Sequence, residues 1–168
     1  PTVAEWINVN PIGMTIEQAW DGKSFLETIK TGKDTGHDYL VISQMAHVLQ
    51  RGVVMNGGKH LYMHTYNDGY HPNFNEEMLF DLEQDWYEQN DIAKDNEDLI
   101  IKAKSHLFDW KNTHMKKLQA NDVEDPLWYI YHDGGPFHAK GHAQMYYNNL
   151  MNIGEEEKAN VVKEKYID

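Results

Sequence analysis

The chain has 168 residues with 27 acidic and 15 basic side chains, which give a formal net charge of −12 with its histidines neutral. This length suffices for one domain with a substantial core. The absence of cysteine excludes disulfides, thiol catalysis and cysteine-ligated zinc, so any bound metal would need nitrogen or oxygen ligands. The acidity argues against nucleic-acid binding, and no apolar segment approaches the roughly 18 residues that suggest a membrane-spanning helix.

The first third of the chain is expected to contain an irregular lead-in and one buried helix. Prolines and glycines interrupt residues 1–36, where a short helix is predicted from about Thr15 to Lys30. No charged-then-apolar leader opens the chain, and Pro1 is compatible with removal of an initiator methionine, so we expect a soluble, cytoplasmic protein. The following run is apolar nearly all round, and its length favours a buried helix over 38–54 that carries a lone histidine, His47.

Residues 56–74 form a long connection that is rich in glycine and histidine. Within it His60, His64 and Asp68 follow one another at four-residue steps, which would place them on one face if the segment were helical. The neighbouring glycines favour instead a polar loop beside a site, where the histidines would supply acid–base groups.

The second half of the chain predicts three further helices. Asn75 and Asp95 are suited to cap helices over 75–90 and 96–119, and Gly134-Gly135 precedes a helix over 137–153. An aromatic segment lies at 127–131, and 155–168 is expected to be a charged terminal helix or tail. Four helices of this size predict a single all-α domain, a four-helix bundle.

The predicted last helix carries the most informative motif. His138 and His142 are four residues apart and share an arc with Met145 and Leu150, so both imidazoles are expected to face the core. Inward histidines of this kind form metal sites in helix bundles. The chain lacks the Glu-x-x-His pairs of di-iron sites, His-Glu-x-x-His, Gly-x-Ser-x-Gly and phosphate-binding glycine loops, which excludes those enzyme classes.

The order of these features resembles the DinB/YfiT-like superfamily over about residues 38–154. The features are a helix with a lone histidine, a long connection, an amphipathic helix, a Gly-Gly turn and the His-x-x-x-His motif. The resemblance implies a bundle that binds a divalent metal through His47, His138 and His142 and acts as a thiol S-transferase or hydrolase on a small molecule. Nitrogen ligands suit zinc, nickel or iron. His132 and Asp133 would orient a ligand imidazole, and His106 and His114, on or beside the apolar stripe of their helix, would pack there or support a metal ligand. A homodimer is plausible for such a bundle.

Two alternatives remain open at this stage. Met145 stands where the superfamily often has glutamine, which favours a non-catalytic, stress-related or ligand-binding member with a degenerate site. The chain would otherwise be an accessory subunit of a larger enzyme complex, with its acidity, the aromatic segment 127–131 and the charged tail as interface.

Overall fold

The computed structural model describes residues 1–9, 20, 22–34, 36–71, 74–120, 122–136 and 139–167. The chain forms two compact units, Pro1–Asp38 and Tyr39–Asp168. In the first unit, α1 (Thr2–Trp6) and α3 (Leu26–Thr31) are joined by a hydrogen bond of 2.9 Å from the Phe25 N–H to Thr2 Oγ1. Of the short helix predicted from Thr15 to Lys30, only the end coincides with α3; residues 10–19 and 21 lie outside the described part.

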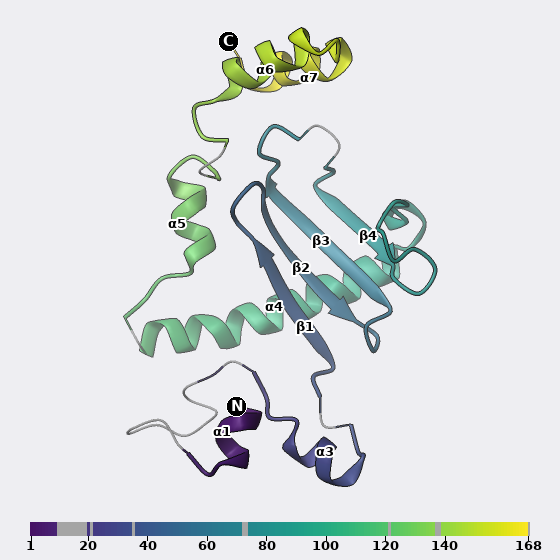
Figure 1. Ribbon diagram of the computed structural model, residues 1–168, viewed down its shortest axis with the longest axis vertical. Helices are drawn as coiled ribbons and strands as arrows, with labels where there is room; N and C mark the ends of the chain where they lie inside the picture. Colours follow the sequence, from purple (N-terminus) through teal and green to yellow (C-terminus); the bar gives the residue numbers. More distant parts are fainter. Residues whose placement is uncertain are drawn as a thin grey trace. The chain divides into compact units, whose positions relative to one another are not determined.

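The second unit is built on an antiparallel sheet of four strands, so the prediction of an all-α four-helix bundle is wrong (Figure 1). The strands are β1 (Tyr39–Gln44), β2 (Leu49–Met55), β3 (His60–Asn67) and β4 (Glu77–Asp81), and they pair in sequence order. The helix expected over 38–54 is therefore a β-hairpin, and the one expected over 75–90 is a strand followed by turns. The connection 56–74 contains a full strand.

Side-chain branching and turn chemistry explain this sheet. Valine and isoleucine favour extended backbone, and β2 is almost entirely buried, so its apolar residues do not alternate with polar ones. Asn56, Gly57 and Gly58 all have positive φ angles, of 57°, 69° and 89°, and they form the turn between β2 and β3. Within β2, a Cβ added at Gly52 would lie 2.5 Å from the Tyr62 carbonyl oxygen, so only glycine fits there.

The remaining elements of the second unit are helical: η1 (Ala93–Asp95), α4 (Glu97–Ala120), α5 (Pro126–His132), α6 (Ala143–Asn152) and α7 (Glu156–Tyr166). The α4 helix confirms the prediction over 96–119, and α7 shows that the charged C-terminal segment is a helix. Of the helix predicted over 137–153, the structure has α6 from Ala143 to Asn152, and residues 137 and 138 lie outside the described part. None of the described helices combines the length and apolar character that a membrane-spanning segment needs.

The two faces of the sheet are covered differently. On one face, Ile100 and Ala103 of α4 pack into a core cluster with Val53, Met55, Tyr62 and Leu79, and α4 crosses behind the strands in Figure 1. On the opposite face, which we call the open face, Leu61, Met63, Met78 and Phe80 pack with Val54 and Leu82. No described helix of Tyr39–Ile167 contributes to this second cluster. The helices α6 and α7 form a third cluster of their own, around Leu150, Ala159 and Val162.

Candidate functional site

The three histidines predicted as metal ligands do not form a described site. His47 lies in the connection between β1 and β2, and His142 is the N-cap of α6, while His138 lies outside the described residues. In the part of the chain that the structure describes, no group of three or more His, Asp or Glu side chains is placed to hold a metal ion. The prediction of a metal-binding four-helix bundle is wrong in its fold, because this unit contains a sheet, and its described residues offer no metal-binding group. The ligand set that includes His138 stays a prediction.

His60, His64 and Asp68 are separated by the strand on which the histidines lie. Four residues of a β-strand span about 13 Å, so a spacing that unites side chains on a helix disperses them here. His60 pairs through Nδ1 with the Asn56 amide at 3.2 Å, and the His64 ring stacks edge-on against Tyr66. Asp68 is buried and accepts a hydrogen bond from the Tyr166 hydroxyl, so it ties α7 to the end of β3.

His106 and His114 have the packing role that was predicted for them. The His106 ring stacks on Tyr39 with 4.3 Å between centroids, and the His114 ring stacks on Trp110 at 4.5 Å. Both contacts lie along α4. Neither histidine belongs to a metal site among the described residues.

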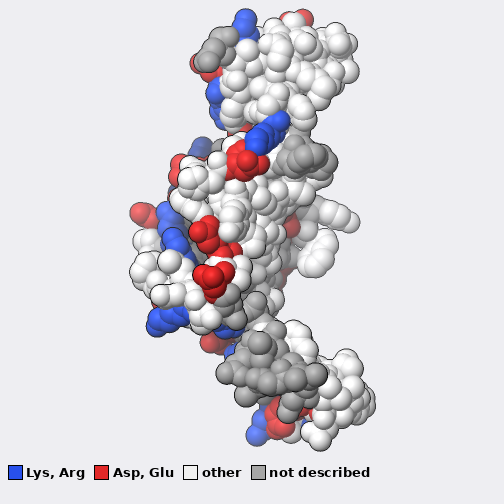
Figure 2. Space-filling view, turned by 90° about the vertical axis from the view of Figure 1, so that its left-hand side faces the viewer, with Lys and Arg blue, Asp and Glu red and all other residues white. Residues whose placement is uncertain are grey.

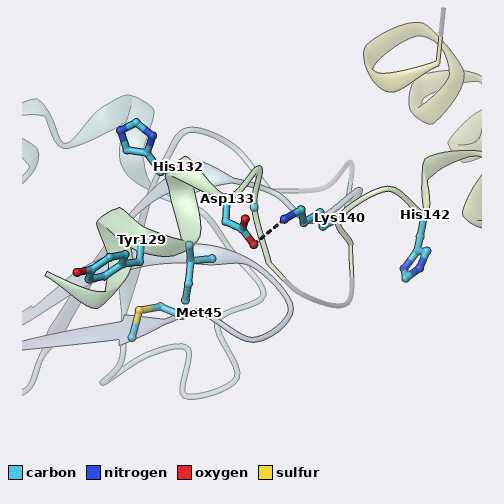
Figure 3. A pocket seen from close by; sticks show the side chains of 8 residues that line it. Met45, Tyr129, His132, Asp133, Lys140 and His142 are labelled. Carbon is cyan, nitrogen blue, oxygen red and sulfur yellow. Dashed lines mark ion pairs between the residues drawn. The ribbon is translucent and has the colours of Figure 1, made fainter. Parts of the chain in front are cut away.

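A cavity of about 860 Å³ lies beside the end of β1, and we call it the β1 cavity (Figure 3). Met45, which follows β1 directly, forms one wall, and residues of α5 and of the segment before α6 form the others. Asp133 pairs with Lys140 at 2.5 Å instead of orienting a histidine. In Figure 3 the His132 ring points away from this ion pair and His142 lies beyond Lys140, so the two imidazoles do not converge. The cavity collects three of the predicted site residues, His132, Asp133 and His142, without forming a catalytic arrangement.

An ion pair between Arg51 of β2 and Asp125 fixes the start of α5, which forms a wall of the β1 cavity. The guanidinium donates two hydrogen bonds to the carboxylate, at 2.7 and 2.9 Å, and its carbon lies 4.6 Å from the centroid of the Trp110 ring. Asp125 also caps α5 by accepting from the Leu127 N–H at 3.0 Å. Burial raises the pKa of Asp125, but these bonds outweigh it and hold the pKa below its ordinary value.

The two edges of the sheet are finished in different ways. The outer edge of β4 is occupied, because the Leu79 N–H donates to Asp91 Oδ1 at 3.0 Å and the Leu79 carbonyl accepts from the Ile92 N–H at 2.8 Å. Among the described residues, the backbone of Leu40–Gln44 in β1 forms hydrogen bonds only with β2. Toward the described part of the chain, the outward backbone groups of Leu40–Gln44 therefore remain available to another strand.

The side chains of β1 lack the features that usually protect an edge strand. The sequence Tyr-Leu-Val-Ile-Ser-Gln contains no charge, proline or bulge, and Leu40 and Ile42 on the open face are 52% and 39% exposed. Figure 2 views the side of the molecule on which β1 forms the sheet edge in Figure 1, and its charged side chains form small groups separated by uncharged surface. An uncharged edge with exposed apolar side chains is typical of strand-pairing surfaces.

The sequence analysis did not predict the ion pair between Arg51 and Asp125, nor that β1 forms an edge of the sheet. The pair Asp125-Pro126 is a recognisable helix start, because aspartate caps and proline fits the first turn. The Asn-Gly-Gly turn is a signal that could have revealed the β2–β3 hairpin.

No protein-family model matches the chain, and no curated protein matches it in sequence. Among solved structures, the chain is similar to the putative sulfatase YidJ from Bacteroides fragilis, with 20% identity, a TM-score of 0.44 and coverage of 62% of this chain. The aligned part spans 20% of the sulfatase chain. At this level the match establishes neither a shared fold nor a shared activity. The resemblance to the DinB/YfiT-like superfamily, with its transferase or hydrolase activity, is neither supported nor refuted by these comparisons and stays a prediction.

Proposed function

We propose that this chain is an accessory subunit that binds a neighbouring polypeptide by pairing β1 with a strand of that partner. The observation that carries the proposal is the difference between the two sheet edges: β4 is closed by Asp91 and Ile92, whereas β1 offers an uncharged, apolar strand. A strand added at such an edge gains main-chain hydrogen bonds and pockets for alternate side chains.

The open face extends the proposed contact beyond the backbone. Leu40 of β1 is paired with Val54 of β2, so Leu40 and Ile42 point to the same side of the sheet as Val54. Apolar side chains of an added strand would cover Leu40 and Ile42 there and remove their exposed surface from water. The adjoining β1 cavity leaves room next to Met45 for the part of the partner that continues past the strand.

Charge favours a different polypeptide over a second copy of this chain. Each copy carries a net charge of −12, so two copies repel one another, whereas a neutral or basic partner is attracted. The proposed partner is therefore an extended segment with alternating apolar side chains and a neutral or positive charge.

A synthetic peptide tests this proposal. The peptide alternates valine with threonine and has lysine at both ends; its control has N-methyl groups on alternate amides, which cannot donate to β1. We expect saturable binding of the first peptide by calorimetry and none of the second. The double variant Leu40→Lys, Ile42→Lys is expected to weaken binding at least about tenfold, because lysine on an edge strand opposes pairing.

The matched control is Ile153→Lys, which makes the same chemical change at a side chain that is 71% exposed after α6. Binding should be unchanged in this variant. Equal binding of both peptides, or of the double variant and the parent, would overturn the proposal. Sedimentation that reports a stable dimer which the two lysines dissociate would instead identify a second copy as the occupant and overturn the choice of partner.

A further inference from the structure

A second cavity, of about 500 Å³, lies where the end of β3 meets α5 and α7, and it is distinct from the β1 cavity. We call it the aromatic cavity, because, together with the His64 imidazole, the rings of Tyr66, Phe74, Tyr131 and Tyr166 line it. These four side chains are between 37% and 49% exposed, so each ring is accessible to a ligand. They come from β3, the segment before β4, α5 and α7, so four separate parts of the chain contribute rings to the lining of one cavity.

Each of the four rings is supported by another ring that lies outside the group. Tyr66 packs edge-on against His64 at 4.5 Å between centroids, and Tyr166 packs edge-on against Tyr70 at 4.8 Å. Phe74 is supported by His71 at 5.7 Å, and Tyr131 is stacked on Trp128 at 5.9 Å. Supported rings lose little freedom when a ligand binds, so this arrangement is preorganised.

The charges of the aromatic cavity favour a cation. Two carboxylates, those of Asp68 and Glu76, lie in its lining, against one ammonium group, that of Lys165. Lys165 is already directed at Asp68, with 3.4 Å between Nζ and Oδ2. Among these three groups one negative charge remains in excess, and it has the same sign as the net charge of the whole chain.

Two phenols of the cavity keep their protons at neutral pH. Burial raises the pKa of Tyr66, and burial together with the hydrogen bond to Asp68 raises the pKa of Tyr166. The rings therefore stay neutral and present the negative faces of their π-systems, to which a cation is attracted when it lies within about 6 Å of the ring centroid.

We propose that the aromatic cavity binds a methylated ammonium group, as found in choline-like small molecules and in methylated lysine side chains. A methylated ammonium cannot satisfy a full set of hydrogen bonds in water, so it loses less on entering a hollow made of rings than a primary ammonium does. Aromatic cages recognise quaternary ammonium in this way, and a cavity of this volume accommodates such a group. The proposal uses residues other than those of β1 and is independent of the proposed function.

Calorimetric titration of the whole chain tests this proposal with choline and with its uncharged carbon isostere, 3,3-dimethylbutan-1-ol. Binding of choline on the order of 1 mM or tighter, without binding of the isostere, is the expected result. A short neutral peptide that contains trimethyllysine distinguishes the two sources of the ligand. If it binds at least about tenfold more tightly than choline, the site reads a modified protein; if choline binds as tightly, the ligand is a free small molecule.

Two tyrosines of the same helix provide matched variants. Tyr131 lines the aromatic cavity and Tyr129 lines the β1 cavity, and both lie in α5. Tyr131→Leu is expected to weaken choline binding about fivefold, whereas Tyr131→Phe and Tyr129→Leu leave it unchanged. Equal loss in Tyr129→Leu and Tyr131→Leu, with unchanged unfolding midpoints, would overturn the proposal, as would equal binding of choline and its isostere.

Discussion

Replacing Arg51 with methionine is expected to lower the free energy of unfolding by about 3 kcal/mol, the cost of leaving a partly buried carboxylate without its counter-ion. The side chains of Arg51 and Asp125 are 10% and 23% exposed, so Asp125 is partly hydrated once the guanidinium is gone, and the effect falls at the lower end for a buried pair. The variant also loses the contact with Trp110 and the bond to Ser43 Oγ at 3.1 Å. Urea unfolding at pH 7 measures the change.

The pH dependence of the free energy of unfolding of Arg51→Met separates the loss of the ion pair from the loss of packing contacts. Because the folded pKa of Asp125 is lowered, its ionisation stabilises the folded state above the unfolded pKa of about 3.9, and this contribution is lost as pH falls through the folded pKa. The difference between the parent and Arg51→Met should therefore shrink below about pH 4. The double variant Arg51→Met, Asp125→Asn keeps the cap of α5 and should recover part of the loss at pH 7. A loss under about 1 kcal/mol, or one that is the same at every pH, would contradict the assigned role of the ion pair.

Gly69→Ala is the second substitution for which a large effect is expected, a loss of about 3 kcal/mol in the free energy of unfolding. Gly69 has φ of +59°, and a Cβ built there would lie 1.9 Å from the His47 carbonyl oxygen. Left-handed backbone costs an alanine about 1 kcal/mol, and displacing the β1–β2 connection from the end of β3 accounts for the rest. Thermal and urea unfolding measure the loss.

Gly57→Ala is the matched control for this prediction. Gly57 has a similar φ of +69°, but no atom lies within 4 Å of a Cβ at that position. We expect it to lose only about 1 kcal/mol, the cost of the backbone conformation alone. Equal losses in the two variants would show that Gly69 is needed for its backbone angle and not for the close approach to His47.

The sequence predicts α4 well because the residues of this helix carry a clear local helical pattern. Leu99, Ala103 and Leu107 recur at four-residue spacing, whereas Asp95, the expected cap, is the last residue of η1. The same stripe packs onto the sheet in the structure, through Ala103 and the partly buried Leu99 and Leu107. Its periodicity matches one secondary structure only, so no tertiary information was needed to predict it.

The hairpin of β1 and β2 was not predicted because its pattern fits two structures. A short run that is apolar nearly all round is compatible with a buried helix or with buried strands, and periodicity alone does not decide between them. The deciding features are non-local. Gly52 is needed because the Tyr62 backbone approaches it from β3, and Val53 belongs to a strand because it is paired on both sides.

The interpretation of the candidate site was limited by the wrong secondary structure. His132, Asp133 and His142 line one cavity, but Asp133 pairs with Lys140 and not with a histidine, and the metal ligand set with His138 stays a prediction. The ion pair of Arg51 and Asp125 joins residues 74 apart in sequence, and Asp68 meets Tyr166 across 98 residues. Contacts between residues so far apart in sequence depend on the sheet. An interpretation of these segments as helices contains no sheet and therefore does not predict such contacts.

Hydrogen exchange of the β1 amides in the isolated chain tests the central claim most directly, namely that β1 is a free edge strand. Amides that donate to β2 should be protected, while the alternate amides of Leu40–Gln44 that point outward should exchange as freely as those of a loop. Addition of the strand-forming peptide should then protect these outward amides. Protection of every amide in β1 before any peptide is added would contradict the account, because it would show that this edge is already covered.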